Sequence, residues 1–172
     1  VRVLTPDERE RLEDLIGPDD CAVIPAFGVP LPVERRLRVI GCEVIDTTCG
    51  NVRRLWAWAE RAAEAGRGVL IFGRAMHDET VVTKSRLAAA GGKYVVVGGL
   101  DEVDVFCRLI RGTERQSFAD RFDTDHTNTE SIEPFLHLAQ DSQTTILYDD
   151  TMEERRRAGE AFAARFGEQE AK

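Results

Sequence analysis

The sequence lacks long hydrophobic runs and closely spaced cysteine pairs, and it has fewer basic than acidic residues, 23 Lys and Arg against 31 Asp and Glu. Its longest apolar stretches are far too short to cross a bilayer, and no signal peptide is recognisable. Its four cysteines show no CxxC or CxC spacing, which argues against a secreted disulfide framework and favours a reducing compartment. The formal net charge of −8 argues against broad nucleic-acid binding, which needs a basic face. A small anionic ligand stays compatible with this charge, because its site needs only local donors.

What the sequence does contain is enough apolar residues for a folded core. It has 172 residues, of which 42% are hydrophobic, an ordinary fraction for a globular protein. This length accommodates one domain, or one domain with part of another. Because the sequence begins at Val1 already in a structured pattern, we expect a piece of a longer protein. The alternative is a processed or tagged complete domain.

Short apolar runs alternate with helical patterns along the chain, and this alternation predicts the fold class. The expected strands are residues 21–27, 44–45, 68–73, 94–97 and 135–141, with 144–148 as an alternative to the last. The expected helices are 6–16, 33–40, 51–65, about ten residues ending near 90, 101–110, and one that ends near 166. Repeated strand–helix units predict an α/β fold with three αβα layers and a mainly parallel sheet. Residues 112–134 lose the pattern, and we expect an irregular loop there with one short helix around Phe118 and a solvated His126.

Capping signals give the expected helix boundaries. Thr5 and Glu8 form a capping box at the first helix, and Asn51 and Asp101 are expected to cap two later ones. A second possible capping box, Thr151 with Glu154, precedes the last expected helix.

Cys49 stands where an expected strand ends and a helix starts. The peptide N–H groups and the positive dipole end of a helix favour a thiolate, so such a cysteine is more reactive or more prone to bind metal. The alternative is a buried structural cysteine, because free cysteine is among the most buried residue types. Cys107 falls on the apolar face of its expected helix and is interpreted as a core residue.

Three polar clusters follow the expected strands. They are Thr47-Thr48-Cys49, His77 with Glu79, and Gln143-Thr144-Thr145. A parallel sheet brings its carboxyl ends to one edge, where these residue types can serve metal ligation, anion binding and proton transfer. If residues 74–80 are extended, His77 and Glu79 point the same way. The alternative for Glu79 is a surface carboxylate at the start of the next helix, where the dipole favours it.

Several short motifs occur together in one known family. In chain order they are Pro25-Ala26-Phe27-Gly28, Asp46-Thr47-Thr48-Cys49, Gly73 to Thr80 (GRAMHDET), Lys93 to Val97 (KYVVV) and Gln143-Thr144-Thr145. Through them the chain resembles the 4-hydroxy-3-methylbut-2-enyl diphosphate reductases, which catalyse the last step of the methylerythritol phosphate route to isoprenoids. The resemblance spans residues 1–166, the middle of the family's chain. Phe27 stands where another branch has histidine, which makes the chain most similar to the plant and cyanobacterial branch.

The resemblance implies a site and a reaction. Family members hold a [4Fe–4S] cluster with three cysteines, one from each of three α/β lobes, and Cys49 matches the middle ligand. His77 matches a histidine that binds the substrate diphosphate, Glu79 matches the acid that delivers protons, and Thr144 matches a threonine that bonds the substrate hydroxyl. Two electrons and two protons remove that hydroxyl and give isopentenyl and dimethylallyl diphosphate. The other two cysteine ligands are expected outside this sequence, and Gly50 replaces a proline that is common in the family.

The resemblance also implies an organisation and partners. Residues 1–49 are expected to be the second half of the first α/β lobe, ending at the cluster cysteine. Residues 50–172 are expected to be the central lobe, with the irregular insertion near 112–134. The expected electron donor is ferredoxin or flavodoxin, and the expected location is the cytoplasm, or the plastid for a plant-like source, with no membrane or nucleic-acid partner. This segment alone is expected to be inactive. The alternatives are a flavodoxin-like module that binds a phosphate ligand without a cluster, and a scaffolding lobe.

Overall fold

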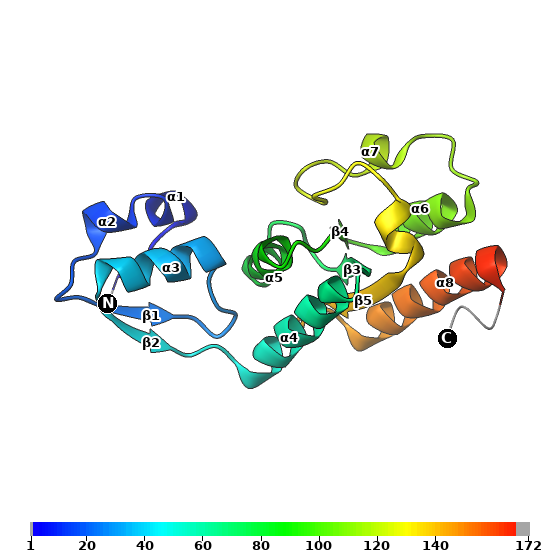
Figure 1. Ribbon diagram of the computed structural model, residues 1–172. Coiled ribbons are helices and arrows are strands. Elements are labelled where there is room, and N and C mark those ends of the chain that lie inside the picture. The colour runs from blue at the N-terminus through cyan, green and yellow to red at the C-terminus, as the bar shows by residue number, and fades with distance from the viewer. Residues whose placement is uncertain (1, 168–172) are drawn as a thin grey trace.

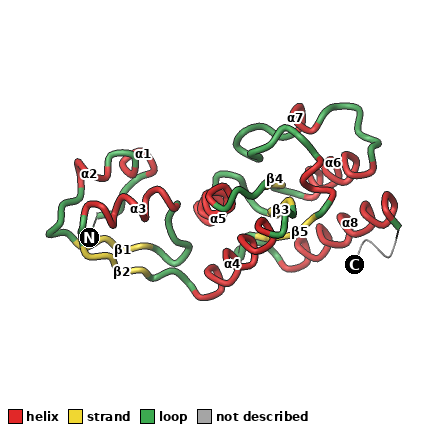
Figure 2. The backbone as a smooth tube through the Cα atoms, viewed as in Figure 1, coloured by secondary structure: helices red, strands yellow, loops and turns green. Residues whose placement is uncertain are grey.

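The computed structural model describes residues 2–167, which form an α/β structure with two separate parallel sheets (Figures 1 and 2). In chain order the elements are α1 (Pro6–Arg9), α2 (Leu12–Leu15), β1 (Cys21–Ile24), α3 (Leu31–Ile40), β2 (Glu43–Asp46), α4 (Gly50–Glu64), β3 (Gly68–Phe72), α5 (Asp78–Ala89), β4 (Tyr94–Val97), α6 (Leu100–Arg111), α7 (Phe118–Arg121), the 3₁₀ helix η1 (Glu133–Leu136), β5 (Leu138–Ser142) and α8 (Tyr148–Phe166). None of these helices is both long enough and apolar enough to cross a membrane.

The smaller sheet pairs β1 with β2 in parallel, with α1, α2 and α3 on one side (Figure 1). Leu12, Ile24 and Leu37 form its core. We expected a buried strand at residues 21–27, and the strand is present, but it is shorter and mostly not buried. The strand ends at Ile24, and Val23 on its other face is 59% exposed because no described element covers that face.

The first helix also differs from expectation. Its capping box between Thr5 and Glu8 is present, but the expected continuous helix breaks after Arg9 and resumes at Leu12. Arg11 adopts φ −123° and ψ 45°, which lies outside the helical region and separates α1 from α2.

The larger sheet has the order β4-β3-β5, with all strands parallel. Every residue of β3 and β4 is buried, as continuous apolar strands in a covered parallel sheet should be. Leu70 and Val95 pack against α6 and α8 on one face, whereas Val69 and Val96 pack against α4 and α5 on the other. This arrangement confirms the three-layer αβα architecture.

The segment before β5 differs from the expected strand at 135–141. Residues Glu133–Leu136 form a 3₁₀ helix, and His137 lies between it and the strand, although its carbonyl accepts a 3.0 Å hydrogen bond from the Gly68 N–H. The 3₁₀ turn places Phe135 in the core, where its ring meets Phe106 edge-on at 5.9 Å. Core packing of one aromatic ring therefore overrides the extended conformation that the local pattern favours.

Two later helix starts were also placed wrongly. α6 begins at Leu100 with Gly99 as its cap, not Asp101. α8 begins at Tyr148, so Thr151 and Glu154 lie inside the helix and form no capping box. Residues 144–148 are therefore not a strand, and the expected end near 166 is confirmed.

The irregular segment 112–134 contains the expected short helix, α7, but it is tied to the sheet. Phe118 and Phe122 are buried in the main core, and Thr127 Oγ1 donates a 2.6 Å hydrogen bond to the Tyr94 carbonyl. His126, expected to be solvated without a partner, lies with Nδ1 2.7 Å from Asp123 Oδ1. A four-residue turn, 123–126, brings this pair together, which composition alone did not indicate.

Candidate functional site

The site centres on the carboxylate of Glu79 in the first turn of α5. Glu79 is only 3% exposed, and it accepts hydrogen bonds from Thr144 at both oxygens. The Thr144 N–H lies 2.9 Å from Oε1, and the Thr144 hydroxyl lies 2.9 Å from Oε2. Donors to both oxygens hold the carboxylate in one orientation, so Glu79 and Thr144, 65 residues apart, form one rigid unit. The predicted proximity of these two residues is confirmed.

Gln143 joins the ends of the two strands that carry this unit. Its N–H donates to the Phe72 carbonyl at 2.9 Å, and its side-chain Oε1 accepts from the Arg74 N–H at 3.2 Å. Gly73 lies against this amide, where a Cβ would approach the Gln143 side chain to 3.1 Å. Gln143 therefore sets the register of β5 against β3, a role that sequence reasoning did not assign to it.

His77 lies beside the unit as the N-cap of α5. Its Nδ1 accepts a 3.3 Å hydrogen bond from the Glu79 N–H. In the neutral ring this leaves Nε2 as the N–H donor, at a helix N-terminus that favours anions. Residues 74–80 are not extended throughout, because the helix starts at Asp78. The His77 side chain therefore contacts Glu79 as the N-cap of the helix. The two side chains do not lie on one face of an extended segment, so that prediction was wrong.

Cys49 occupies the carboxyl end of β2 in the other sheet. It is the N-cap of α4, so the helix begins at Gly50 and the expected cap at Asn51 was wrong. Its thiol is exposed, which contradicts the alternative of a buried structural cysteine. The Cys49 N–H donates a 2.7 Å hydrogen bond to the Ala26 carbonyl, so the loop after β1 holds the cysteine in place.

The described residues do not form a complete metal site. Residues 2–167 contain no group of three or more His, Cys, Asp or Glu side chains arranged to hold a metal ion. Cys42 and Cys107 are buried, in agreement with the core interpretation of Cys107, and Cys21 is exposed on β1. A cluster that needs three thiolates therefore finds no complete set of ligands among the described residues.

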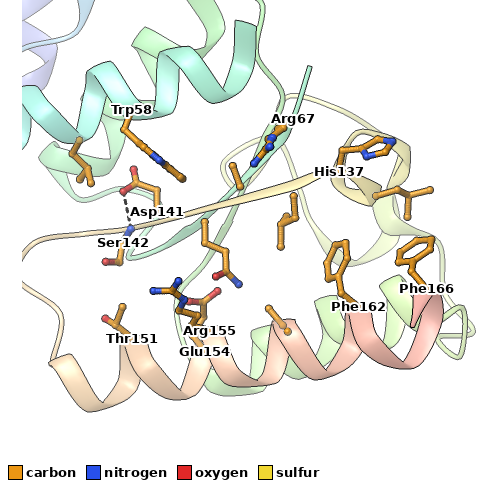
Figure 3. A pocket seen from close by; sticks show the side chains of 17 residues that line it. Trp58, Arg67, His137, Asp141, Ser142, Thr151, Glu154, Arg155, Phe162 and Phe166 are labelled. Carbon is orange, nitrogen blue, oxygen red and sulfur yellow. Dashed lines mark hydrogen bonds between the residues drawn. The ribbon is translucent and has the colours of Figure 1, made fainter. Parts of the chain in front are cut away.

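A groove of about 940 Å³ runs along the outer edge of β5, between α4 and α8 (Figure 3). Trp58 of α4 and Asp141 of β5 lie on one side of it, and Glu154 and Arg155 rise from α8 on the other. A second space, too small to hold a water molecule, is lined by both Glu79 and Asp141. Sequence reasoning assigned no role to Asp141, which is buried in β5.

The comparisons with known proteins decide the family. A model of the family described as LytB protein matches residues 2–169. The chain belongs to the LytB protein family. The chain spans about a third of the length of the curated LytB relatives it matches.

Two such relatives are 4-hydroxy-3-methylbut-2-enyl diphosphate reductases. That of Synechococcus sp. strain CC9311 is 31% identical over 142 residues, covering 80% of this chain and 34% of the relative. That of Cyanothece sp. strain PCC 7425 is 28% identical over 156 residues, covering 88% of this chain and 37% of the relative. These cyanobacterial sources agree with the branch indicated by Phe27.

Solved structures share the fold of this LytB segment. A structure of (E)-4-hydroxy-3-methyl-but-2-enyl diphosphate reductase superposes with a TM-score of 0.61 and 22% identity, covering 96% of this chain and 51% of that one. A reductase from Plasmodium falciparum gives a TM-score of 0.61 at 18% identity, covering 89% of this chain and 39% of that one. At these identities the similarity establishes the α/β fold of the family.

Proposed function

We propose that the full-length protein containing this chain reduces 4-hydroxy-3-methylbut-2-enyl diphosphate to isopentenyl and dimethylallyl diphosphate. Membership of the LytB family and the names of the curated relatives support this proposal. The structural observation that carries it is the buried Glu79 carboxylate, held at both oxygens by Thr144 beside the His77 ring. An acid fixed next to an anion-binding position suits the removal of a hydroxyl from a diphosphate ester.

Each residue of this unit has a part in the proposed reaction. His77 binds a diphosphate oxygen through its Nε2–H, because Nδ1 accepts the Glu79 N–H. Thr144 orients both the acid and the substrate hydroxyl, since its own hydroxyl can donate to one and accept from the other. Glu79 transfers protons, because hydroxide is a poor leaving group and departs as water only after protonation. The burial of Glu79 excludes bulk water from the proton it delivers.

A [4Fe–4S] cluster, when bound in the full-length protein, supplies the electrons for this reduction. Cys49 is its proposed ligand from this segment, supported by its exposed thiol at the start of α4. The two further ligands come from outside this chain. Ferredoxin or flavodoxin is the proposed electron donor, and the cytoplasm, or the plastid for a plant-like source, is the proposed location. Residues 1–49 and 50–172 are proposed to belong to two successive lobes, in keeping with the two separate sheets.

One observation favours a second candidate function, a phosphate-binding module without a cluster. His77 stands at the N-terminus of α5, and the described residues contain no group of three or more side chains that could hold a metal ion. A full-length protein that binds inorganic diphosphate through His77 and retains no iron after anaerobic reconstitution would support this candidate.

The test of the proposed function is Glu79→Gln in the full-length protein. The substitution keeps the size of the side chain and removes its transferable proton. We expect retained iron and substrate binding, with single-turnover reduction at least about a hundredfold slower. The matched control is Asp78→Asn, which removes a charge from the same helix turn and leaves the hydrogen bonds of Thr144 to Glu79 intact. Reduction by Glu79→Gln at the parent rate would remove Glu79 from the mechanism.

A further inference from the structure

Arg86 of α5 reaches side chains on two other helices, and the proposed mechanism leaves it without a role. Its Nη2 atom lies 3.2 Å from a carboxylate oxygen of Glu34 on α3, the helix that covers the β1–β2 sheet. Its Nη1 atom lies 3.8 Å from a carboxylate oxygen of Glu60 on α4. Its Cζ atom lies 3.9 Å from the centroid of the Trp56 ring, also on α4. One side chain of α5 thus contacts both α3 and α4.

These contacts hold the Arg86 guanidinium in one place. Only 19% of the Arg86 side chain and 21% of the Glu34 side chain are exposed, so solvent screens this pair less than an ordinary surface pair. A planar guanidinium can stack on an aromatic ring while it pairs with carboxylates, which a lysine ammonium does less well. The Arg86 Nε atom is enclosed without a hydrogen-bond partner among the described residues. The ring and the two carboxylates therefore set the orientation of the guanidinium.

Trp56 connects this contact to Cys49. It is 5% exposed and lies seven residues after Cys49, about two turns along α4. The Trp56 ring also packs against Gly28, where a Cβ would collide with it. Two residues before Gly28, the Ala26 carbonyl accepts the hydrogen bond from the Cys49 N–H. A continuous series of contacts thus runs from Arg86 through the Trp56 ring and the loop after β1 to the cysteine.

Along α5, Arg86 stands in the same relation to Glu79. The two residues are seven positions apart, so they lie about two turns from each other on nearly the same side of the helix. Ser85, the residue before Arg86, accepts a 3.1 Å hydrogen bond at Oγ from the Leu31 N–H at the start of α3. The contacts of α5 with α3 and α4 therefore concentrate two turns from the acid and two turns from the cysteine.

We propose that Arg86 is a positioning residue that keeps Cys49 and Glu79 at a fixed separation by clamping α5 to α3 and α4. This inference rests on the proposed function, in which the ligand thiolate and the acid serve one substrate. Arg86 touches none of the reacting atoms. It acts on Cys49 through Trp56 and the loop after β1, and on Glu79 through α5. A displacement of about 1 Å between reacting groups can lower a rate about a hundredfold, so a clamp two turns away affects turnover.

The first test is Arg86→Met in the full-length, cluster-containing protein. Methionine keeps an apolar stem against Trp56 but removes the charge and both ion pairs. Single-turnover reduction is measured at a temperature where circular dichroism shows every variant to be folded. We expect unchanged iron content and a rate per folded molecule about tenfold or more below that of the parent. A merely structural Arg86 predicts easier unfolding with an unchanged rate per folded molecule, and this outcome would overturn the proposal.

Two further variants sharpen this test. In the Arg86→Met background, Glu34→Gln should cause no further loss of rate, because its contact with α5 is already gone. Losses that simply add would contradict the clamp. The matched control is Arg61→Met, which removes the same charge from an exposed position on α4 that has no ion pair among residues 2–167. Arg61→Met should leave the rate unchanged.

A second measurement does not depend on activity. Spin labels attached through non-natural amino acids at the exposed positions Asn51 and Met76 report the separation of the starts of α4 and α5 by pulsed EPR. Asn51 lies two residues after Cys49, and Met76 precedes His77. We expect one narrow distance distribution in the full-length parent and in Arg61→Met, and a broader or shifted distribution in Arg86→Met.

An unchanged distribution in Arg86→Met would overturn the inference. If the full-length protein shows no reductase activity, the proposed function fails. The distance measurement alone then decides whether Arg86 fixes the two helix starts relative to each other.

Discussion

Glu79 and Glu154 are both almost fully buried, and their surroundings give them different properties. Glu79 accepts two hydrogen bonds from Thr144, whereas Glu154 Oε1 has no hydrogen-bond partner among the described residues. For Glu154, burial raises the pKa to about 7, with Arg155 acting weakly in the opposite direction. A carboxylate with fixed donors is suited to orient a substrate, while one without donors holds its proton and reduces stability once ionised.

This difference predicts that Glu154→Gln changes how the stability of this chain depends on pH. The unfolded chain releases the Glu154 proton near pH 4.5, but the folded chain keeps it up to about 7. The contribution of Glu154 to stability is therefore full below pH 4.5 and decreases as pH rises through 7. The free energy of unfolding of Glu154→Gln, relative to that of the parent, should rise by on the order of 3 kcal/mol between pH 5 and pH 8, measured by urea unfolding.

Glu153→Gln is the control for that measurement, because Glu153 lies in the same helix with the opposite shift. Hydrogen bonds from Arg156 and Arg157 lower the pKa of Glu153 to about 2. The contribution of the Glu153 carboxylate to stability is present above pH 4.5 and is lost only as pH falls toward 2. The difference in free energy of unfolding between Glu153→Gln and the parent should stay constant from pH 5 to pH 8. A constant difference for Glu154→Gln as well would show that its carboxyl is already ionised in the folded chain.

At Cys49, we predict that Cys49→Ser abolishes iron retention in the full-length protein and leaves the fold intact. Serine is isosteric, but its hydroxyl is a poor ligand where a soft thiolate is needed. Because the thiol is exposed, the substitution leaves no buried cavity. Visible absorbance and circular dichroism on one sample measure both effects. Cys21→Ser, at another exposed thiol, is the control and should keep the iron. Iron bound equally by Cys49→Ser would remove this residue from the ligand set.

At the scale of elements, the loop after β1 connects the two sheets. Gly28 in this loop has φ +80°, and a Cβ there would collide with the ring of Trp56 in α4. Two residues earlier, Ala26 accepts the hydrogen bond from Cys49. On the other side of this junction, the Leu31 N–H donates a 3.1 Å hydrogen bond to Ser85 Oγ of α5. The loop thus positions the cysteine and packs against α4 at the same time.

We therefore predict that Gly28→Ala destabilises the chain by about 2–5 kcal/mol. About 1–2 kcal/mol comes from the left-handed backbone and the rest from overpacking against Trp56. Gly41→Ala is the matched control, because Gly41 has φ +78° but nothing within 4 Å of its Cβ position. Gly41→Ala should lower the free energy of unfolding only by the about 1–2 kcal/mol that comes from the left-handed backbone. Chemical denaturation of both variants measures the difference, and equal losses would show that Trp56 moves aside without cost.

At the scale of the whole molecule, we predict that the 172-residue chain alone does not hold a cubane cluster. It offers one suitable thiolate, and the described residues contain no alternative group of three ligands. Iron and sulfide analysis after anaerobic reconstitution measures this directly. The full-length protein, treated in parallel, is the positive control. A nearly stoichiometric cluster on the chain alone would contradict the assignment of a single ligand.

The sequence predicted the elements whose pattern is local. The strands β3 and β4, the helix α3 with Gly41 at its end and the short helix at Phe118 follow from apolar periodicity and turn residues that act within a few positions. The predictions failed where distant contacts decide the conformation. Phe135 enters the core and turns its segment into a 3₁₀ helix, and the uncovered face of β1 leaves Val23 exposed.

The sequence by itself determined the family, through motifs that occur in a fixed order, and with it the candidate residues Cys49, His77, Glu79 and Thr144. Only the tertiary structure decided how these four residues are arranged in space. It joined Glu79 to Thr144 across 65 residues, left Cys49 exposed in the other sheet, and enclosed Asp141 beside Glu79. The physical reason is that burial and hydrogen-bond partners depend on packing between strands and helices far apart in sequence, which no local pattern encodes.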